Sequence, residues 1–338
     1  MQLQQEQDQR LWTRTFIVVT IANFLLFVSL QLLVAPFPAY AKAAFDPGDV
    51  ALGLLTSLFA VSAVAGRLIA TACLRQVGRN RMLLAGLALS VATILLYAYA
   101  PSYGVFLFIR VVFGLAFGMT STVVPTIGSA VIPGRRMGEG IGYFGLSTSL
   151  AMSIGPAAGL YVLDRHAFES LTGIAAVAAA AIAPLLMLAA KLPPEPPRLK
   201  RSETRAAGGA SGKMSRRALV PAGLNVLMAV TYGGLLGFLA LYGEERGIAG
   251  IGFFFMLTVV TIVIVRPLAG RLFDRKGPGY VLVPAALFLM AALLLLSYAS
   301  GFPGVAAAAL LYGVGFGAVQ MASQAWMLGL VAKEQHAK

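Results

Sequence analysis

Long apolar stretches separated by short polar links run through the whole chain. Each stretch is close to the ~20 residues that a helix needs to cross the hydrocarbon core of a bilayer. The ten predicted spanning helices are 15–38, 50–72, 81–100, 103–130, 140–163, 168–190, 218–242, 249–270, 280–299 and 303–331. The pattern therefore predicts an all-α protein that crosses a membrane many times.

One link departs from this pattern in length and in composition. Residues 191–217, KLPPEPPRLKRSETRAAGGASGKMSRR, are rich in Pro, Gly and Arg and cannot bury themselves. Such a segment is typical of a flexible linker. We therefore predict an N-terminal six-helix bundle at 1–190, a linker at 191–217 and a C-terminal bundle of four helices at 218–338.

The composition agrees with a membrane protein and narrows its chemistry. Hydrophobic residues make up 59% of the chain and charged residues 12%, against roughly 25% charged residues in soluble domains. Two histidines and the single Cys73 exclude a disulfide framework and disfavour a Cys/His metal site. The chain has no G-x-x-x-x-G-K-[ST] motif, which argues against an ATP-driven pump. We expect no metal and no cofactor.

The net charge of +13 is better explained by membrane topology than by nucleic-acid binding. With the N-terminus in the cytoplasm, the outer loops hold only Lys42, Arg165 and Arg246 of the 26 lysines and arginines. This distribution follows the positive-inside rule. We therefore expect a cytoplasmic N-terminus, a cytoplasmic linker and no nucleic-acid partner.

The two halves of the chain repeat one another at a constant separation of 199 residues. Matching Gly, Arg and Tyr positions at helix ends are much harder to obtain by chance than matching Ala or Leu. The matched pairs include Gly53 with Gly252, Arg67 with Arg266, Gly78 with Gly277 and Tyr99 with Tyr298. An internal repeat joined by a linker is typical of membrane transporters.

The repeat also predicts how many helices a full second half should have. Glu139, which opens the fifth helix, maps onto position 338, so the second half stops where its fifth helix should begin. We therefore expect a shortened chain that lacks two helices. A genuine ten-helix protein is the alternative.

A charged, glycine-containing stretch, RPLAGRLFDRKGPG at 266–279, lies between the eighth and ninth helices. Together with the 6 + 6 repeat and the central linker, it resembles the major facilitator superfamily, whose loop signature is G-x-x-x-D-R-x-G-R-R. Gly270, Asp274, Arg275 and Gly277 fit that signature. In the first-half copy Gly78 and Arg79 fit, whereas Thr71 and Arg75 replace the first Gly and the Asp.

Two further motifs resemble the drug/metabolite:proton antiporter branch of that family. Arg110 to Gly114, RVVFG, is similar to the R-x-x-q-G signature of proton-coupled members. Gly155, Pro156 and Gly159 are similar to the core of the antiporter motif in the fifth helix. The resemblance implies a bacterial exporter of small drugs or metal-chelating metabolites in the cytoplasmic membrane. It also places the glycine face of the fifth helix against the eighth helix.

The loop residues have the chemistry of a latch for a rocking transporter. Gly270 lets two helices approach closely, and Asp274 can accept hydrogen bonds from a helix N-terminus or pair with an arginine. Arg67 and Arg266, four residues before each loop motif, are candidates for gating or for snorkelling to the interface. A cytoplasmic loop with turn glycines is the plainer alternative for the whole stretch.

Arg110 lies about eight residues into the fourth helix, where a charge costs at least a few kcal/mol. We expect it to face an aqueous cavity and to act in proton coupling or in attracting an anionic substrate group. An arginine that snorkels outward is the alternative.

The resemblance further implies that the first, fourth, seventh and tenth helices line a central substrate cavity. The residues it nominates are Asn23, Phe27, Gln31, Met119, Thr120, Thr122, Asn225, Tyr232, Gln320, Gln324 and Trp326.

These observations leave three functional hypotheses. The motif in the fifth helix favours a monomeric, proton-driven exporter of small, partly hydrophobic molecules, for which the lipid bilayer and the substrate are the partners. An uptake symporter or uniporter for a sugar or organic anion is the second, and an inactive fragment is the third.

No carboxylate is expected at membrane depth, since all acids lie near helix ends or in loops. No cluster of His and acidic residues supports an enzyme.

Overall fold

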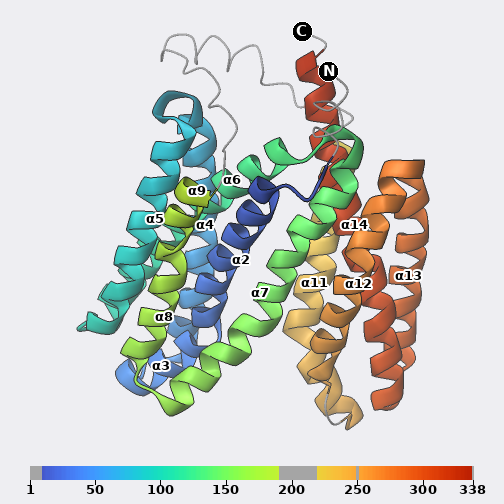
Figure 1. Cartoon of the computed structure of the whole chain (residues 1–338). Helices are drawn as coiled ribbons and strands as arrows, with labels where there is room; N and C mark the ends of the chain where they lie inside the picture. The colour runs from blue at the N-terminus through green and yellow to red at the C-terminus, as the bar shows by residue number, and fades with distance from the viewer. Residues whose placement is uncertain (1–9, 190–218, 249–250, 337–338) are drawn as a thin grey trace. The chain divides into compact units, whose positions relative to one another are not determined.

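The computed structural model describes residues 10–189, 219–248 and 251–336, which form long helices joined by short turns (Figure 1). The predicted linker at 191–217 lies outside the described residues. The helices are α2 (Arg14–Val34), α3 (Pro36–Phe45), α4 (Asp49–Val77), α5 (Arg79–Leu96), α6 (Tyr103–Val131), α7 (Met137–Arg165), α8 (Phe168–Ala180), α9 (Ile182–Ala189), α11 (Leu219–Arg246), α12 (Phe253–Lys276), α13 (Gly279–Tyr298) and α14 (Phe302–His336).

Each predicted span coincides with helical structure, which confirms the all-α membrane architecture. Nine helical segments of the described chain are long and apolar enough to cross a membrane. The seventh predicted span falls on α11, whose apolar part, Leu219–Leu235, is shorter. The first span divides into α2 and α3 at Ala35, because Pro36 has no N–H to continue the helical bonding of α2.

The described chain separates into two compact units. One contains Trp12–Val131 and the described residues that follow Leu150 as far as Ala189. The other contains Ile132–Ser149 together with α11, α12, α13 and α14. Helix α7 is therefore shared, since its first half packs with the C-terminal helices and its second half with the N-terminal ones. The predicted domain bounds, which gave all of α7 to the N-terminal bundle, stay a prediction.

The N-terminal unit has an aromatic core at the end where α3 lies. The ring of Phe37 packs against Tyr97 and Phe106 with centroid separations of 4.5 and 5.2 Å. Tyr40 stacks on Phe168 at 3.6 Å, which attaches α3 to α8. Aromatic packing of this kind contributes about 0.5–1.5 kcal/mol per pair beyond the burial of area.

The internal repeat is visible in the turns of the backbone. Gly78 ends α4 and Gly277 ends α12, with φ of 88° and 87°, a region that favours glycine. The Gly78 amide donates to Leu74 O at 3.1 Å, and the Gly277 amide donates to Phe273 O at 2.8 Å. Donors and acceptors are both related by the 199-residue separation.

The repeat extends to the packing of helices inside each unit. Gly114 of α6 lies against Phe59 and Ser62 of α4, and Gly313 of α14 lies against Thr258 and Thr261 of α12. The contact positions again differ by 199 residues. The described chain therefore consists of two bundles with the same helix packing, as the sequence repeat predicted.

Candidate functional site

The candidate site begins where the N-terminus of α7 meets the last turns of α12. Asp274 Oδ1 accepts from the Gly138 amide at 2.7 Å, and Oδ2 accepts from the Glu139 amide at 2.8 Å. The first amides of a helix have no partner within the helix, and the positive end of its dipole favours an anion. The carboxylate of Asp274 thus caps a helix that lies 136 residues away in the chain.

A second carboxylate lies one residue inside this cap. Glu139 is only 5% exposed. Its Oε2 contacts Arg136 Nη2 at 2.6 Å, and its Oε1 accepts from Arg271 Nε at 3.0 Å. Glu139 lies in the first turn of α7, near a helix end as the sequence predicted, but its burial was not predicted. Burial is tolerated because both oxygens are paired with arginines.

The backbones of α7 and α12 touch at a pair of glycines. A Cβ on Gly138 would lie 2.6 Å from Gly270 O and 2.9 Å from Asp274 Oδ1. A Cβ on Gly270 would lie 2.8 Å from the Cα of Glu139. Both distances are too short for a side chain, so the cap can form only while both positions are glycine.

Further along the same contact, Arg266 of α12 reaches both neighbouring helices. It is buried, and its Nη1 donates to the Gly145 carbonyl of α7 while its Nη2 donates to Gln320 Oε1 of α14. Gly142 and Gly145 provide the room, since a Cβ on either would lie 2.7 Å from an Arg266 atom. Its repeat partner Arg67 is exposed. The two arginines therefore differ in environment, although the sequence treated them alike.

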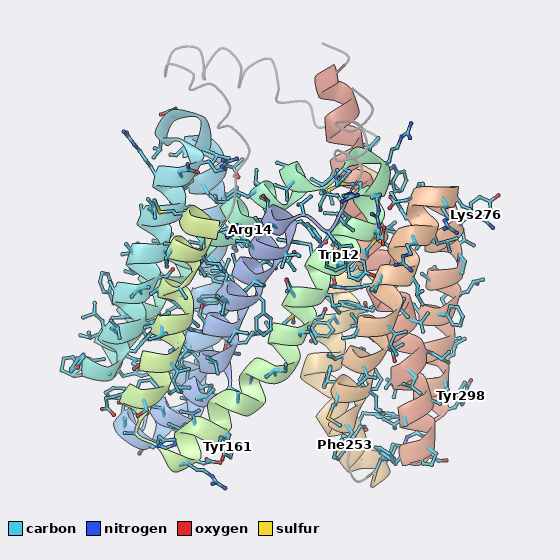
Figure 2. All side chains as sticks on the ribbon, in the orientation of Figure 1. Trp12, Arg14, Tyr161, Phe253, Lys276 and Tyr298 are labelled. Carbon is cyan, nitrogen blue, oxygen red and sulfur yellow. The ribbon has the colours of Figure 1, made fainter. Side chains whose placement is uncertain are left out.

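The remaining residues of the two loop motifs have different environments. Arg275 and Lys276 are exposed at the end of α12, and Lys276 Nζ lies 5.7 Å from the ring of Tyr280 (Figure 2). In the first-half copy Arg79 is buried beside Asn80, and its Nε lies 3.5 Å from Asn80 Oδ1.

Arg110 is buried within the N-terminal unit. Its Nε donates to Leu55 O of α4 at 3.1 Å, and its guanidinium lies 4.8 and 4.4 Å from the ring centroids of Phe37 and Phe59. The hydroxyl of Tyr97 interacts with it electrostatically. The alternative that Arg110 snorkels outward is contradicted by this burial. Its role in coupling stays a prediction.

The glycines of the antiporter-like motif pack closely on helices of their own unit. A Cβ on Gly155 would lie 3.1 Å from the backbone carbon of Gln31, and a Cβ on Gly159 would lie 3.1 Å from Pro36 Cγ. The motif therefore packs on α2 and α3, where Pro36 cannot donate to the Leu32 carbonyl and leaves it open to close approach. The resemblance had placed this face against the eighth helix, and that contact stays a prediction.

The glycine face that meets α12 is an earlier one, and the sequence reasoning missed it. Gly138, Gly142 and Gly145 recur at spacings of four and three residues, which puts them on one face of α7. The same spacing was available in the sequence as a signal. Arg271, which pairs with Glu139, was also missed, because only its position on α12 shows which acid it faces.

The predicted cavity residues have varied environments. Thr120, Thr122 and Asn225 donate to carbonyls of their own helices. Phe27 packs on Phe117 at 5.6 Å, and Tyr232 packs on Phe316 at 5.3 Å. The buried members are Asn23 and Thr120, the partly exposed ones are Phe27, Gln31, Met119, Thr122, Asn225, Tyr232, Gln320 and Trp326, and Gln324 is exposed. That they line a cavity stays a prediction.

The described chain has membrane-spanning helices, an internal repeat and a contact between α7 and α12 that the Asp274 carboxylate caps. These features are typical of membrane transporters. The sequence profile of the Major Facilitator Superfamily matches residues 19–338. The chain therefore belongs to this superfamily and is a transporter rather than an enzyme.

Similar proteins agree with this assignment. Multidrug resistance protein 2 of Bacillus subtilis is 23% identical over 170 residues, which is 49% of this chain and 42% of that protein. An uncharacterized MFS-type transporter of Methanocaldococcus jannaschii is 20% identical over 90% of this chain and 78% of its own length. The chain thus matches less than half the length of the first of these relatives.

Solved structures show the same fold. The human organic anion transporter MFSD10 aligns with a TM-score of 0.70 at 18% identity over 95% of this chain and 91% of that one. The transporter FucP in its outward conformation aligns with a TM-score of 0.71 at 18% identity over 97% of this chain and 91% of that one.

Proposed function

We propose that this protein is a secondary active transporter that works by alternating access. It exports small, partly hydrophobic molecules in exchange for protons that enter down their gradient. The observation that carries the proposal is the capped contact in which Asp274 binds the first amides of α7. Alternating access needs a contact that is strong in one state and breakable in another. A carboxylate that is held by two backbone amides has these properties.

The orientation of the latch follows from the loop charges. The positive-inside distribution supports a cytoplasmic position for the N-terminus, Gly277 and the Asp274 cap, and the resemblance to bacterial exporters supports a bacterial inner membrane. Closing the contact between α7 and α12 would shut that face. Opening it requires Asp274 to leave the α7 amides and Arg271 to release Glu139, and each group then regains water.

Export and proton coupling rest on the motifs in α6 and α7 and on the name of one relative. Multidrug resistance protein 2 shares the fold family, and this supports drug-like substrates. Arg110 is proposed as the coupling residue because it is a buried cation whose Nη1 has no hydrogen-bond partner among the described residues. Proton coupling also needs a group that gains and loses a proton, because an arginine stays protonated, and Glu139 with Asp274 supplies carboxylates at the latch.

Transport in proteoliposomes tests the proposal. The purified protein is reconstituted with ethidium as a fluorescent, partly hydrophobic probe, and an imposed pH gradient is reversed between runs. We expect ethidium to move against the proton flow and to stop when the gradient is collapsed. Movement that ignores the pH gradient would instead support the uniporter hypothesis, and movement in the same direction as protons would support the symporter.

A further inference from the structure

Arg266 is a buried cation whose environment the latch does not explain. It is 6% exposed, and no carboxylate of the described residues forms an ion pair with it. Its two hydrogen-bond partners among the described residues, the Gly145 carbonyl and the Gln320 amide, are neutral. A buried charge that is satisfied only by neutral acceptors is poorly compensated, because bonds between opposite charges are about twice as strong.

The guanidinium has one edge that is only half used. Nη1 donates to Gly145 O and fixes the group against α7. Nη2 donates to Gln320 Oε1, while Nε on the same edge has no hydrogen-bond partner in the described chain. The Nε–Nη2 edge is one of the two-donor forks that carboxylates bind with both oxygens.

Gln320 is the hydrogen-bond partner on this edge that an anion would replace. Its side chain is long and partly exposed, and its amide oxygen mimics one of the two oxygens of a carboxylate. The contact of Nη1 with Gly145 would remain. Glycine at 145 is required for this arrangement, since a Cβ there would lie 2.7 Å from Nη1.

The surroundings of this edge suit an apolar body attached to the anion. Phe316 lies one turn before Gln320 on α14, so the two side chains share a face. Tyr232 of α11 packs on Phe316 at 5.3 Å, and both rings are partly exposed. Aromatic rings beside a fork of donors are the combination that binds aromatic acids.

We propose that Arg266 is the anion-binding residue of the transport site and that its ligand is an organic carboxylate with an apolar or aromatic body. The carboxylate binds Nε and Nη2 together and displaces Gln320 Oε1. This inference narrows the substrate class of the proposed transporter and rests on that proposed function.

The test compares aromatic carboxylates with amides of the same shape. Purified protein in lipid nanodiscs is heated with benzoate or 1-naphthoate, and with benzamide or 1-naphthamide as neutral controls. We expect the acids to raise the melting temperature at millimolar concentration and the amides to leave it unchanged. If neither acid exceeds its amide, or if chloride at equal concentration does as much, the inference is overturned.

Two variants separate a binding role from a structural role. Arg266→Gln should raise the acid concentration needed for a given rise in melting temperature by at least about 10-fold. This is the loss of affinity expected when a pair of charge-assisted hydrogen bonds is removed. Gln320→Glu should keep or raise the melting temperature of the free protein, because it supplies Arg266 with an internal carboxylate, yet it should abolish the response to the acids. Arg81→Gln, which removes an exposed arginine of α5, is the matched control and should respond as the original protein does.

The opposite pattern identifies Arg266 as a structural clamp. In that case Arg266→Gln lowers the melting temperature of the free protein, but Gln320→Glu keeps the full response to the acids. That result overturns the binding role, and it does so even if Arg266→Gln fails to fold. Flux of 1-naphthoate and of ethidium is measured on the same preparations. If the unaltered protein responds to the acids but transports neither probe, the proposed function fails while this site stands.

Discussion

Asp274 shows how much a single carboxylate can do at the boundary between two helices. Each of its oxygens accepts one backbone amide, and each amide belongs to the first turn of α7. A hydrogen bond to a charged acceptor is worth about 1.5–3 kcal/mol. Removing the charge should therefore weaken the latch more than removing any exposed ion pair.

Replacing Asp274 by Asn should leave membrane insertion intact and slow transport. Asn can accept from only one of the two amides, and its NH₂ group would then face the other donor, so a loss of roughly 2 kcal/mol is expected for the closed state. Transport rates in proteoliposomes measure the effect. Asp46→Asn is the control, because Asp46 is exposed and its φ of 45° suits Asn equally well. Unchanged flux in Asp274→Asn would remove the latch from the mechanism.

Arg271→Gln should have a smaller effect on the latch than Asp274→Asn. The Arg271 side chain is 53% exposed, and exposed ion pairs contribute about 0.2–1 kcal/mol. Arg136 continues to pair with Glu139 in this variant, so the buried carboxylate keeps one partner. At low salt, Asp274→Asn should slow transport more than Arg271→Gln does. At high salt, the transport rate of Arg271→Gln should approach that of the unaltered protein, whereas the rate of Asp274→Asn should not. The reverse ranking would contradict the assignment of the cap as the main contact.

Arg110→Ala should abolish proton-driven export while the protein still inserts. The variant removes the bond to Leu55 O and the guanidinium between the rings of Phe37 and Phe59. Export of ethidium driven by an imposed pH gradient is the measurement. Export at the original rate would show that Arg110 serves packing alone.

At the scale of helices, glycine pairs decide how closely two elements approach. The repeat keeps the close contact but exchanges the glycine between the two partners. In the first half Gly86 of α5 meets Ala116 of α6, and in the second half Ala285 of α13 meets Gly315 of α14. One glycine is therefore enough for this close contact, and it can lie on either of the two helices.

Gly270→Ala should separate α7 from α12 and release the cap. The added methyl would lie 2.8 Å from the Cα of Glu139, and backbone cannot move aside as a flexible side chain can. We expect a lower melting temperature and slower transport, with a cost of about 1–3 kcal/mol. Gly173→Ala in α8 is the control, because a Cβ there meets nothing within 4 Å. Equal behaviour of the two variants would mean that the close approach has no energetic weight.

At the scale of the whole molecule, the loop charges predict which ends of the helices face the cytoplasm. In a variant with Cys73 replaced by Ser, a cysteine at Arg165 should react with a membrane-impermeant maleimide added to intact cells. A cysteine at Lys276 should react only after the membrane is opened. Both side chains are exposed, so burial does not limit the reaction. Labelling with the opposite pattern would invert the proposed topology and place the latch outside.

The sequence by itself determined the membrane class, the approximate positions of the spanning helices and the internal repeat of this protein. Length and hydropathy are local properties, and a spanning helix satisfies its own backbone, so no knowledge of its neighbours is needed to find it. Turn glycines such as Gly78 and Gly277 could also be predicted, because their φ values are set by the turn itself. The loop motif that contains Asp274 was recognisable for the same reason.

Only the tertiary structure decided which residues meet. Arg67 and Arg266 occupy equivalent places in the repeat, yet one is exposed and the other joins three helices. The partner of a side chain depends on the rotation of each helix about its axis and on the small residues that let backbones touch, and neither is written in one segment alone. For that reason the burial of Glu139, the packing of Gly155 on α2 and the half-used edge of Arg266 could be found only in the folded chain.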